Sequence, residues 1–129
     1  MAVKNPYTPI EEGGWNTHQL AAHTRDVHAL VYGMRAQRTA TEDNPMFKSF
    51  DGDAYMAEHY DPKEPLGKML DEFAASVESM AGLVKGLPAE GWARLSSHET
   101  NGGGLTLQTW VERALGHIEE HWESVRKAK

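Results

Sequence analysis

The sequence of 129 residues contains no cysteine, which excludes disulfide cross-links, cysteine-ligated zinc and a cysteine nucleophile. Any thiol chemistry must therefore use a thiol from another molecule. Basic residues are also few: the chain has 13 Lys and Arg and 19 Asp and Glu, which gives a formal net charge of −6. This charge argues against a nucleic-acid-binding module, which relies on clustered Lys and Arg.

Long apolar runs are absent as well. No segment approaches the roughly 20 apolar residues of a membrane span, and residues 1–10 lack the apolar run of a signal peptide. We therefore expect a cytoplasmic protein. A chain of this length with 40% hydrophobic residues fits one domain with a real core.

Three stretches have helical periodicity, and segments rich in Gly, Pro, Asp and Asn separate them. The first helix is expected to begin at Asn16, because Gln19 has the spacing of a capping box. The second covers about 65–85. The third is expected to start with Thr106 as its cap and to run to about Lys127, so the pattern predicts an all-α fold.

Two connections separate these helices. The connection 38–64 is long for a helical bundle, and we expect a short helical turn over 53–59 to divide it. The connection 87–105 contains Trp92, which is expected to pack under the bundle. It also contains the run Gly102 to Gly104, which we expect to form a mobile lip because it lacks the lysine of a phosphate-binding loop.

Three histidines fall on the predicted core-facing sides of two helices. His23 lies within the apolar stripe of the first helix, which is made up of Leu20, His23, Thr24, Val27, Leu30, Val31 and Met34. His117 and His121 follow Trp110 and Ala114 by two turns each, so they share the apolar side of the third helix. Because residues four apart on a helix point the same way, His117 and His121 can reach one ion.

The spacing predicts a divalent metal site formed by His23, His117 and His121. Three imidazoles suit zinc or nickel and leave at least one position open for water or a thiol. Asp26 and Glu120, each one turn from a histidine, could orient the rings or be solvent-facing charges. The alternative is that the histidines are hydrogen-bonded core residues without a metal.

The remaining histidines are expected to have no ligand role. His18 and His28 lie five residues on either side of His23, which rotates them off its face, so we expect them to be exposed to solvent. His59 and His98 lie in the connections, where they could approach the mouth of a site.

Several segments resemble the DinB-like superfamily of metal-binding helical bundles. The run Gly14-Trp15-Asn16, followed by His23, is similar to that family's "tryptophan, then histidine eight on" segment. The run Leu105 to Trp110, followed by His117 and His121, is similar to its last helix. The loops Phe50-Asp51-Gly52-Asp53 and Leu87 to Trp92 also match in order and spacing, so the resemblance covers roughly Trp15 to Arg126.

The resemblance implies a four-helix, up-down bundle over 15–129 that holds a metal through the same three histidines, with 1–14 as an N-terminal arm. Characterised members of the superfamily include bacillithiol transferases and the mycothiol-dependent maleylpyruvate isomerase, and others are described as metal-dependent hydrolases. It therefore implies a low-molecular-weight thiol as a second cofactor. No polymerase activity follows from the family name.

One feature departs from the family pattern. Its members carry a long helix before the tryptophan segment, whereas Pro6 and Pro9 are unsuited to a helix interior here. Three helices would leave one apolar side uncovered, so we expect a second subunit to cover it as a homodimer. Alternatively, the 38–64 segment fills the gap within one chain.

Three functions remain open at this point. The first is a thiol-dependent S-transferase, in which the metal presents a thiolate to a small-molecule electrophile; the catalytic residues and the electrophile are not identified. The second is a non-enzymatic dimerisation or binding module with a structural metal or none. The third is a hydrolase that uses metal-bound water.

Overall fold

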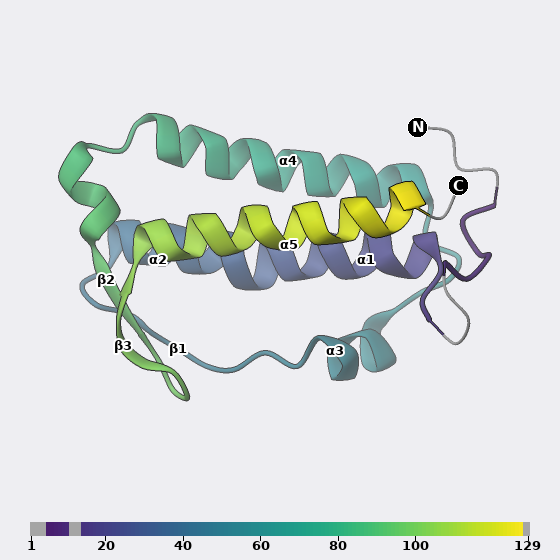
Figure 1. The fold of residues 1–129 in the computed structure, drawn as a ribbon, viewed down its shortest axis with the longest axis horizontal. Coiled ribbons are helices and arrows are strands. Elements are labelled where there is room, and N and C mark those ends of the chain that lie inside the picture. The colour runs from purple at the N-terminus through teal and green to yellow at the C-terminus, as the bar shows by residue number, and fades with distance from the viewer. Residues whose placement is uncertain (1–4, 11–13, 128–129) are drawn as a thin grey trace.

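The computed structural model describes residues 5–10 and 14–127. Most of them are helical, and the elements are α1 (Thr17–Val27), the π-helical turn η1 (His28–Tyr32), α2 (Gly33–Thr41), α3 (Gly52–His59), α4 (Leu66–Lys85), the 3-10 turn η2 (Ala89–Ala93) and α5 (Leu107–Lys127). Because α1, η1 and α2 follow without a break, they form one long helix (Figure 1). The predicted all-α helical bundle is confirmed, and the short α3 lies where a helical turn was expected.

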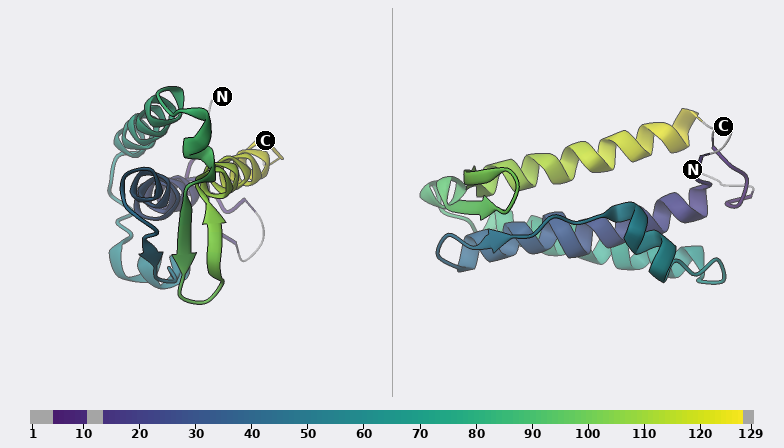
Figure 2. Two further views of the ribbon diagram at one scale, coloured as in Figure 1. Left: turned by 90° about the vertical axis from the view of Figure 1, so that its left-hand side faces the viewer. Right: turned by 90° about the horizontal axis from the view of Figure 1, so that it is seen from below.

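The long helix of α1 and α2 lies at the centre. Both α4 and α5 pack against it, and the view along the bundle shows them on two different sides (Figure 2). The segment with α3 runs along a third side. The central helix therefore has neighbours around much of its circumference. None of the helices in the described part of the chain has the length and apolar character that a membrane crossing requires.

The two predicted helix caps, Asn16 and Thr106, are confirmed, and α4 begins at Leu66, close to the expected residue 65. The Asn16 side chain accepts the backbone N–H of Gln19 at 2.7 Å, and the Gln19 side chain accepts the N–H of Asn16 at 2.9 Å. This reciprocal pair satisfies amide groups that have no partner within the helix. At α5, the hydroxyl of Thr106 accepts the N–H of Thr109 at 3.2 Å.

A π-helical turn interrupts the central helix at its midpoint. The N–H of Gly33 donates to the carbonyl of His28, five residues earlier, which places one extra residue in this turn. A β-carbon at position 33 would lie 2.7 Å from that carbonyl oxygen, so glycine allows the close approach. The buried side is displaced from this turn onward: Leu30, within the turn and expected in the core, is 42% exposed, and Arg35, after the turn, is buried.

A small sheet at one end of the bundle was not predicted. β1 (Met46–Phe47) pairs in parallel with β2 (Leu95–His98), which pairs antiparallel with β3 (Gly102–Thr106). The expected lip is thus the hairpin of β2 and β3. Gly102 and Gly104 have φ of +84° and +77°, a conformation that favours glycine, and their lack of side chains removed the alternating pattern of a strand.

Trp110 connects this sheet to the bundle. Its indole N–H donates to the hydroxyl of Ser96 at 2.8 Å, and its fully buried ring meets the ring of Phe47 edge-on at 5.7 Å. Aromatic pairs of this kind contribute about 1 kcal/mol beyond the area that they bury. The half-buried Trp92 packs against the same cluster, as expected.

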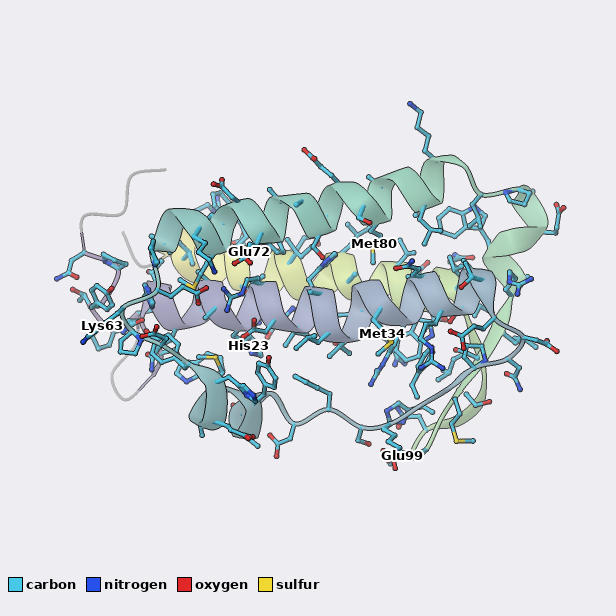
Figure 3. The ribbon with its side chains drawn as sticks, turned by 180° about the vertical axis from the view of Figure 1, so that it is seen from behind. His23, Met34, Lys63, Glu72, Met80 and Glu99 are labelled. Carbon is cyan, nitrogen blue, oxygen red and sulfur yellow. The ribbon has the colours of Figure 1, made fainter. Side chains whose placement is uncertain are left out.

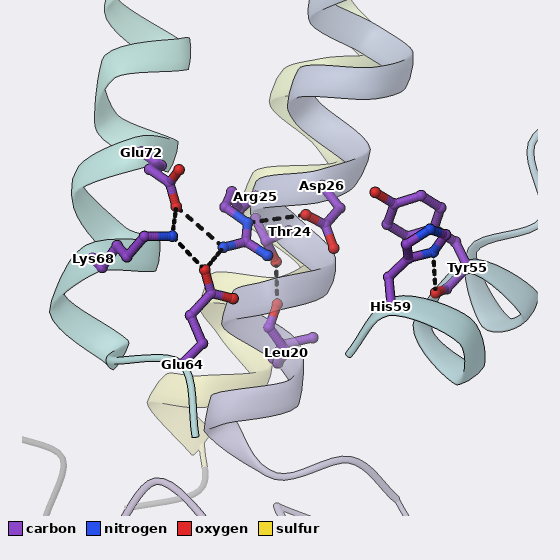
Figure 4. A network of polar contacts seen from close by, with 9 residues as sticks. All are labelled: Leu20, Thr24, Arg25, Asp26, Tyr55, His59, Glu64, Lys68 and Glu72. Carbon is purple, nitrogen blue, oxygen red and sulfur yellow. Dashed lines mark hydrogen bonds and ion pairs between the residues drawn. The ribbon is translucent and has the colours of Figure 1, made fainter. Parts of the chain in front are cut away.

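A polar network joins α1 to the start of α4 (Figure 4). The Arg25 guanidinium contacts Glu64 at 2.6 Å and Glu72 at 3.2 Å, and Lys68 bridges the same two carboxylates. Because Arg25 and Glu64 are largely shielded from water, this pair is screened less than an exposed one. The network fixes α1 and α4 relative to each other.

The described part of the N-terminal arm, residues 5–10, is not helical, and no described residue before Thr17 belongs to a helix. The arm does contact the bundle: Tyr7 donates its hydroxyl hydrogen to the Pro62 carbonyl at 2.7 Å, and its ring stacks on His18. The boundary drawn between an arm and a domain at residue 14 stays a prediction.

An apolar groove of about 270 Å³ lies over α1 between α4 and α5. Its walls are formed by Thr17, Leu20, Ala21, Thr24, Leu66, Leu70, Phe73, Ile118, His121, Trp122 and Val125. No wall residue comes from 38–64, so that segment does not fill this groove. Coverage by a second subunit stays a prediction.

The homodimer can be tested at the groove. Leu70, 49% exposed on α4, lies in its wall, so Leu70→Glu should place a charge in the interface and give a monomer by sedimentation velocity. Leu115→Glu is the matched control, because Leu115 is 54% exposed on α5 but lies outside the groove wall. A wild-type protein that is monomeric at micromolar concentration would contradict the prediction.

Candidate metal centre

Three histidine rings meet where α1 and α5 pack together. The Nε2 atom of His117 lies 3.2 Å from Nε2 of His23 and 2.8 Å from Nε2 of His121. One ring nitrogen from each residue lies within 4.8 Å of the other two, and all three residues are half-buried. The convergence expected from helical spacing is therefore confirmed; that these residues bind an ion stays a prediction.

Packing fixes the position of the His23 ring. Trp15 lies just before the start of α1, and the centroid of its ring is 4.8 Å from that of the His23 ring. On the side toward α3, a β-carbon added to Gly52 would lie 3.1 Å from Cε1 of His23, so glycine permits the approach of this segment. Figure 3 shows His23 on the side of α1 that faces α3.

The two histidines of α5 lie on adjacent turns of the helix. Their ring centroids lie 4.2 Å apart, and the Tyr32 ring lies 5.5 Å from that of His117. The Nδ1 atom of His117 is buried without a hydrogen-bond partner among the described residues. Ring packing, rather than a carboxylate or a carbonyl, therefore orients His117.

Burial keeps the three rings neutral. Burial, together with the charges that His121 and His23 would carry, lowers the pKa of His117 to about 4. Burial also lowers the pKa of His23 and of His121 from the ordinary value. Near pH 7 the rings therefore have lone pairs, which is the form that binds a metal.

The donor set fits a borderline divalent ion. Metal–nitrogen bonds of about 2.0 to 2.1 Å place two ligand nitrogens about 3.3 Å apart at a tetrahedral angle and about 2.9 Å apart at a right angle. The two distances that involve His117, 3.2 Å to His23 and 2.8 Å to His121, lie close to these values. Three neutral nitrogens without a thiolate suit zinc or nickel more than calcium or magnesium.

An open cavity of about 430 Å³ adjoins the cluster on the side of α3 and the hairpin. Its walls consist of His23, Val27, Val31, Tyr32, Arg35, Ser49, Phe50, Gly52, His98, Thr100, Asn101 and His117. The segment 38–64 thus forms one wall of the cavity. Small-molecule sites commonly have this size and this mixture of apolar and polar groups.

The sequence profile of the DinB superfamily matches residues 5–125. The chain belongs to the DinB superfamily. This match confirms the resemblance that the tryptophan and histidine segments indicated. No curated protein sequence matches the chain significantly.

A solved structure shares the fold of this DinB-superfamily chain. It is described as YfiT from Bacillus subtilis, a probable metal-dependent hydrolase with an unusual four-helix bundle topology. The TM-score is 0.77 with 23% sequence identity, and the alignment covers 98% of this chain and 74% of that one. The likeness confirms the helical-bundle fold.

Neither carboxylate suggested as a partner of the histidines has that role in this DinB-superfamily chain. The Asp26 carboxylate accepts a hydrogen bond from Arg25 at 2.9 Å instead. Glu120 is exposed and forms no hydrogen bond to a ring among the described residues, although its charge favours the protonated forms of His23 and His121.

The expectation that His18 and His28 are exposed is wrong. His18 is 0% exposed: its Nε2–H donates to the Glu64 carbonyl at 2.7 Å, so its Nδ1 accepts from the Tyr60 hydroxyl at 2.6 Å. His28 is 1% exposed, and its Nδ1 contacts the Ser76 hydroxyl at 2.9 Å. Both are buried because the central helix has neighbours on several sides.

The other two histidines differ in their surroundings. His59 is exposed on α3, where its ring stacks on Tyr55. His98 is buried on β2 and lines the cavity, as its expected approach to the mouth of a site suggested. Sequence reasoning missed Arg35 and Tyr32 as cavity residues; Gly33 within a helical pattern was the available signal for the displaced face.

The metal-free protein should lose stability as the pH falls from about 6.5 to about 4. The pKa of His117 is lower in the folded chain than in the unfolded chain, so the unfolded chain binds more protons in this range. Urea unfolding should show that His117→Asn reduces the loss, by an amount on the order of 1 kcal/mol. His59→Asn, at an exposed position, is the control; equal slopes in both variants would contradict the assignment.

Proposed function

We propose that this chain is a divalent-metal-dependent enzyme that transfers a low-molecular-weight thiol to an electrophile. The observation that carries the proposal is the convergence of three neutral imidazoles, two of which, His23 and His117, line an open cavity. Zinc or nickel suits this donor set. Membership in the DinB superfamily supports a metal-dependent role.

The chemistry depends on an incomplete ligand set. A bound zinc or nickel ion would supply a Lewis acid that favours deprotonation of a thiol or of water. Three imidazoles contribute no negative charge, so they leave the charge of the ion available to an anionic partner. The chain itself orients His23 through Trp15 and Gly52 and lines part of the cavity with the apolar side chains of Val27, Val31 and Phe50.

A hydrolase is the second candidate, and the description of YfiT as a probable metal-dependent hydrolase favours it. Metal-dependent hydrolysis commonly uses a carboxylate as general base. None of the residues that line the cavity is Asp or Glu. A thiol, with a pKa of about 8.5, needs less help than water to lose its proton, so the cavity favours thiol transfer over hydrolysis.

A purely structural metal is the third possibility. Structural zinc sites usually have four protein ligands and no open position. In the described part of the chain, only three histidines form the cluster, and it borders a cavity. This arrangement favours a site that exchanges a ligand.

Metal content and the response to thiols test the proposal. The untagged protein should bind one equivalent of cobalt or zinc, whereas His117→Ala should lose most of this affinity, because two nitrogens hold an ion far less tightly than three. In the cobalt protein, N-acetylcysteine should change the visible absorption spectrum as sulfur enters the coordination sphere. His59→Ala, on the exposed side of α3, should behave as the wild type.

The possible results separate the three candidates. Equal metal content in the wild type and in His117→Ala would show that the histidine cluster is not the metal site. Metal binding with no spectral response to any thiol would overturn the transferase and leave a hydrolytic or structural metal. A spectral response followed by thiol conjugation of an electrophile such as a chloronitrobenzene would support the transferase.

A small change next to His23 should weaken the site without touching a ligand. Gly52→Ala places a methyl group 3.1 Å from Cε1 of His23, so the ring must move by a few tenths of an ångström. We expect zinc affinity to fall about tenfold, as for the loss of other groups that orient a ligand. Gly67→Ala is the control, because nothing lies within 4 Å of its added carbon; equal affinity in both variants would contradict the assigned position of His23.

A further inference from the structure

Arg35 is a buried arginine that has no carboxylate partner in the part of the chain that the structure describes. It is 7% exposed, and its guanidinium carbon lies 4.8 Å from the ring centroid of Trp110 and 5.7 Å from that of Phe47. Its Nη2 donates one hydrogen bond, to the carbonyl of Lys48 at 2.9 Å. Its Nε is buried and has no hydrogen-bond partner among the described residues.

Four of the other five arginines have their charge or their donors satisfied, and the fifth, Arg113, is exposed to solvent, with its guanidinium carbon 5.3 Å from the centroid of the Trp110 ring. Arg25, Arg38 and Arg126 form ion pairs with carboxylates, and Arg94 donates to the carbonyls of Thr39 and Glu42. Burial of an unpaired charge costs several kcal/mol. Stacking on Trp110 offsets only about 1 to 2 kcal/mol of it, so Arg35 retains capacity to bind an anion.

Arg35 lines the same cavity as His23 and His117. The cavity wall contains no carboxylate, although the whole chain has a net charge of −6. The nearest acidic side chain on the hairpin, that of Glu99, accepts the backbone N–H of Ser49 and does not line the cavity. No carboxylate of the wall therefore neutralises Arg35, whereas the charges of Asp53 and Glu120 act on His23 at the other end of the cavity.

His98 adds a second donor. Its Nδ1 accepts the backbone N–H groups of Thr100 at 3.1 Å and Asn101 at 3.2 Å. A neutral ring that accepts at Nδ1 has its proton on Nε2, so His98 has a donor left over on the side of the ring away from the hairpin turn. Arg35 and His98 come from α2 and β2, and both line the cavity.

The spacing along α5 gives the distance between the histidine cluster and Arg35. Trp110, against which Arg35 stacks, is seven residues before His117, which corresponds to about 10 Å along the helix axis. A small molecule that reaches from the histidine cluster toward Arg35 is of the size that a cavity of about 430 Å³ accepts.

We propose that Arg35, with His98, binds a carboxylate of the substrate whose reacting end lies at the histidine cluster. The substrate class is thus a small organic acid with its reactive group several bonds from the carboxylate. The position of the reacting end rests on the proposed function, whereas the anion site is inferred from Arg35 independently of that function. The planar fork of the guanidinium matches a carboxylate in two hydrogen bonds.

The test uses the cobalt protein and two series of probes, the ω-mercaptocarboxylates and the ω-mercaptoalcohols of the same chain lengths. The cobalt spectrum reports the sulfur end, and the ratio of dissociation constants within each pair reports the carboxylate end. We expect the acid to bind at least about tenfold more tightly than the alcohol at the optimal length. Arg35→Gln should abolish this ratio, and Arg35→Lys should retain part of it.

Arg38→Gln is the matched control, because Arg38 also stacks on Phe47 but pairs with Glu42 and lies outside the cavity wall. Equal binding of acid and alcohol by the wild type would overturn the inference, and so would a ratio that Arg35→Gln lowers no more than Arg38→Gln does. In both cases a cobalt response to the alcohols would leave the proposed function standing.

A measurement on the wild-type protein covers the case in which Arg35→Gln fails to fold. The Nε–H resonance of Arg35 in a nitrogen-15 NMR spectrum should shift on addition of sodium hexanoate, and hexanol should leave it unchanged. No shift with hexanoate would overturn the anion site. A shift without any thiol response of the cobalt protein would support the anion site while the transferase proposal fails.

Discussion

The structure depends on the contact between α1 and α5 at which three imidazole rings meet. The Nε2 atoms of His117 and His121 lie 2.8 Å apart, and two protonated rings at this distance would repel strongly, so the two rings cannot both be charged. Burial provides this condition by holding the pKa of His117 near 4. The same burial that disfavours charge therefore prepares the nitrogens for a metal, and Trp15, Gly52 and Tyr32 keep the rings in place.

The central position of the α1–α2 helix explains the buried histidines. Its neighbours are α5 on one side, α4 on another and the α3 segment on a third. A polar ring can be buried on any of these sides if it finds hydrogen-bond partners, as His18 does with Tyr60 and the Glu64 carbonyl. His18 is thus a core residue, whereas His23 is directed to the cavity.

The positions that depend on contacts between residues close in the sequence could be predicted. Asn16 and Gln19 form a capping box because their spacing allows it, and His117 and His121 lie on one face because they are four apart. His23 could be grouped with these two histidines because each of the two helices has one apolar stripe and the histidines lie within it. The superfamily resemblance, carried by the same histidines and by Trp15, gave the fold.

Residues placed by long-range contacts could not be predicted. The hairpin of β2 and β3 has three glycines and no alternating pattern, and its partner β1 lies about 50 residues away along the chain. Arg35 was missed because an uninterrupted α-helix would have turned Met34 toward the buried side in its place. His18 and His28 were assigned to solvent because a single helix pattern does not show how many neighbours surround it.

The π-helical turn at His28–Tyr32 determines which side chains share the cavity with the histidine cluster. Each residue of an α-helix turns by about 100°, so the extra residue rotates everything from Gly33 onward by about that angle. The long helix therefore behaves as two segments with independently set faces, one presenting His23 and the other Arg35. A DinB-superfamily chain without this turn would keep the three histidines but present a different side chain at the far end of the cavity. Gain or loss of one residue here would thus change the lining at the far end of the cavity while the histidine cluster is retained.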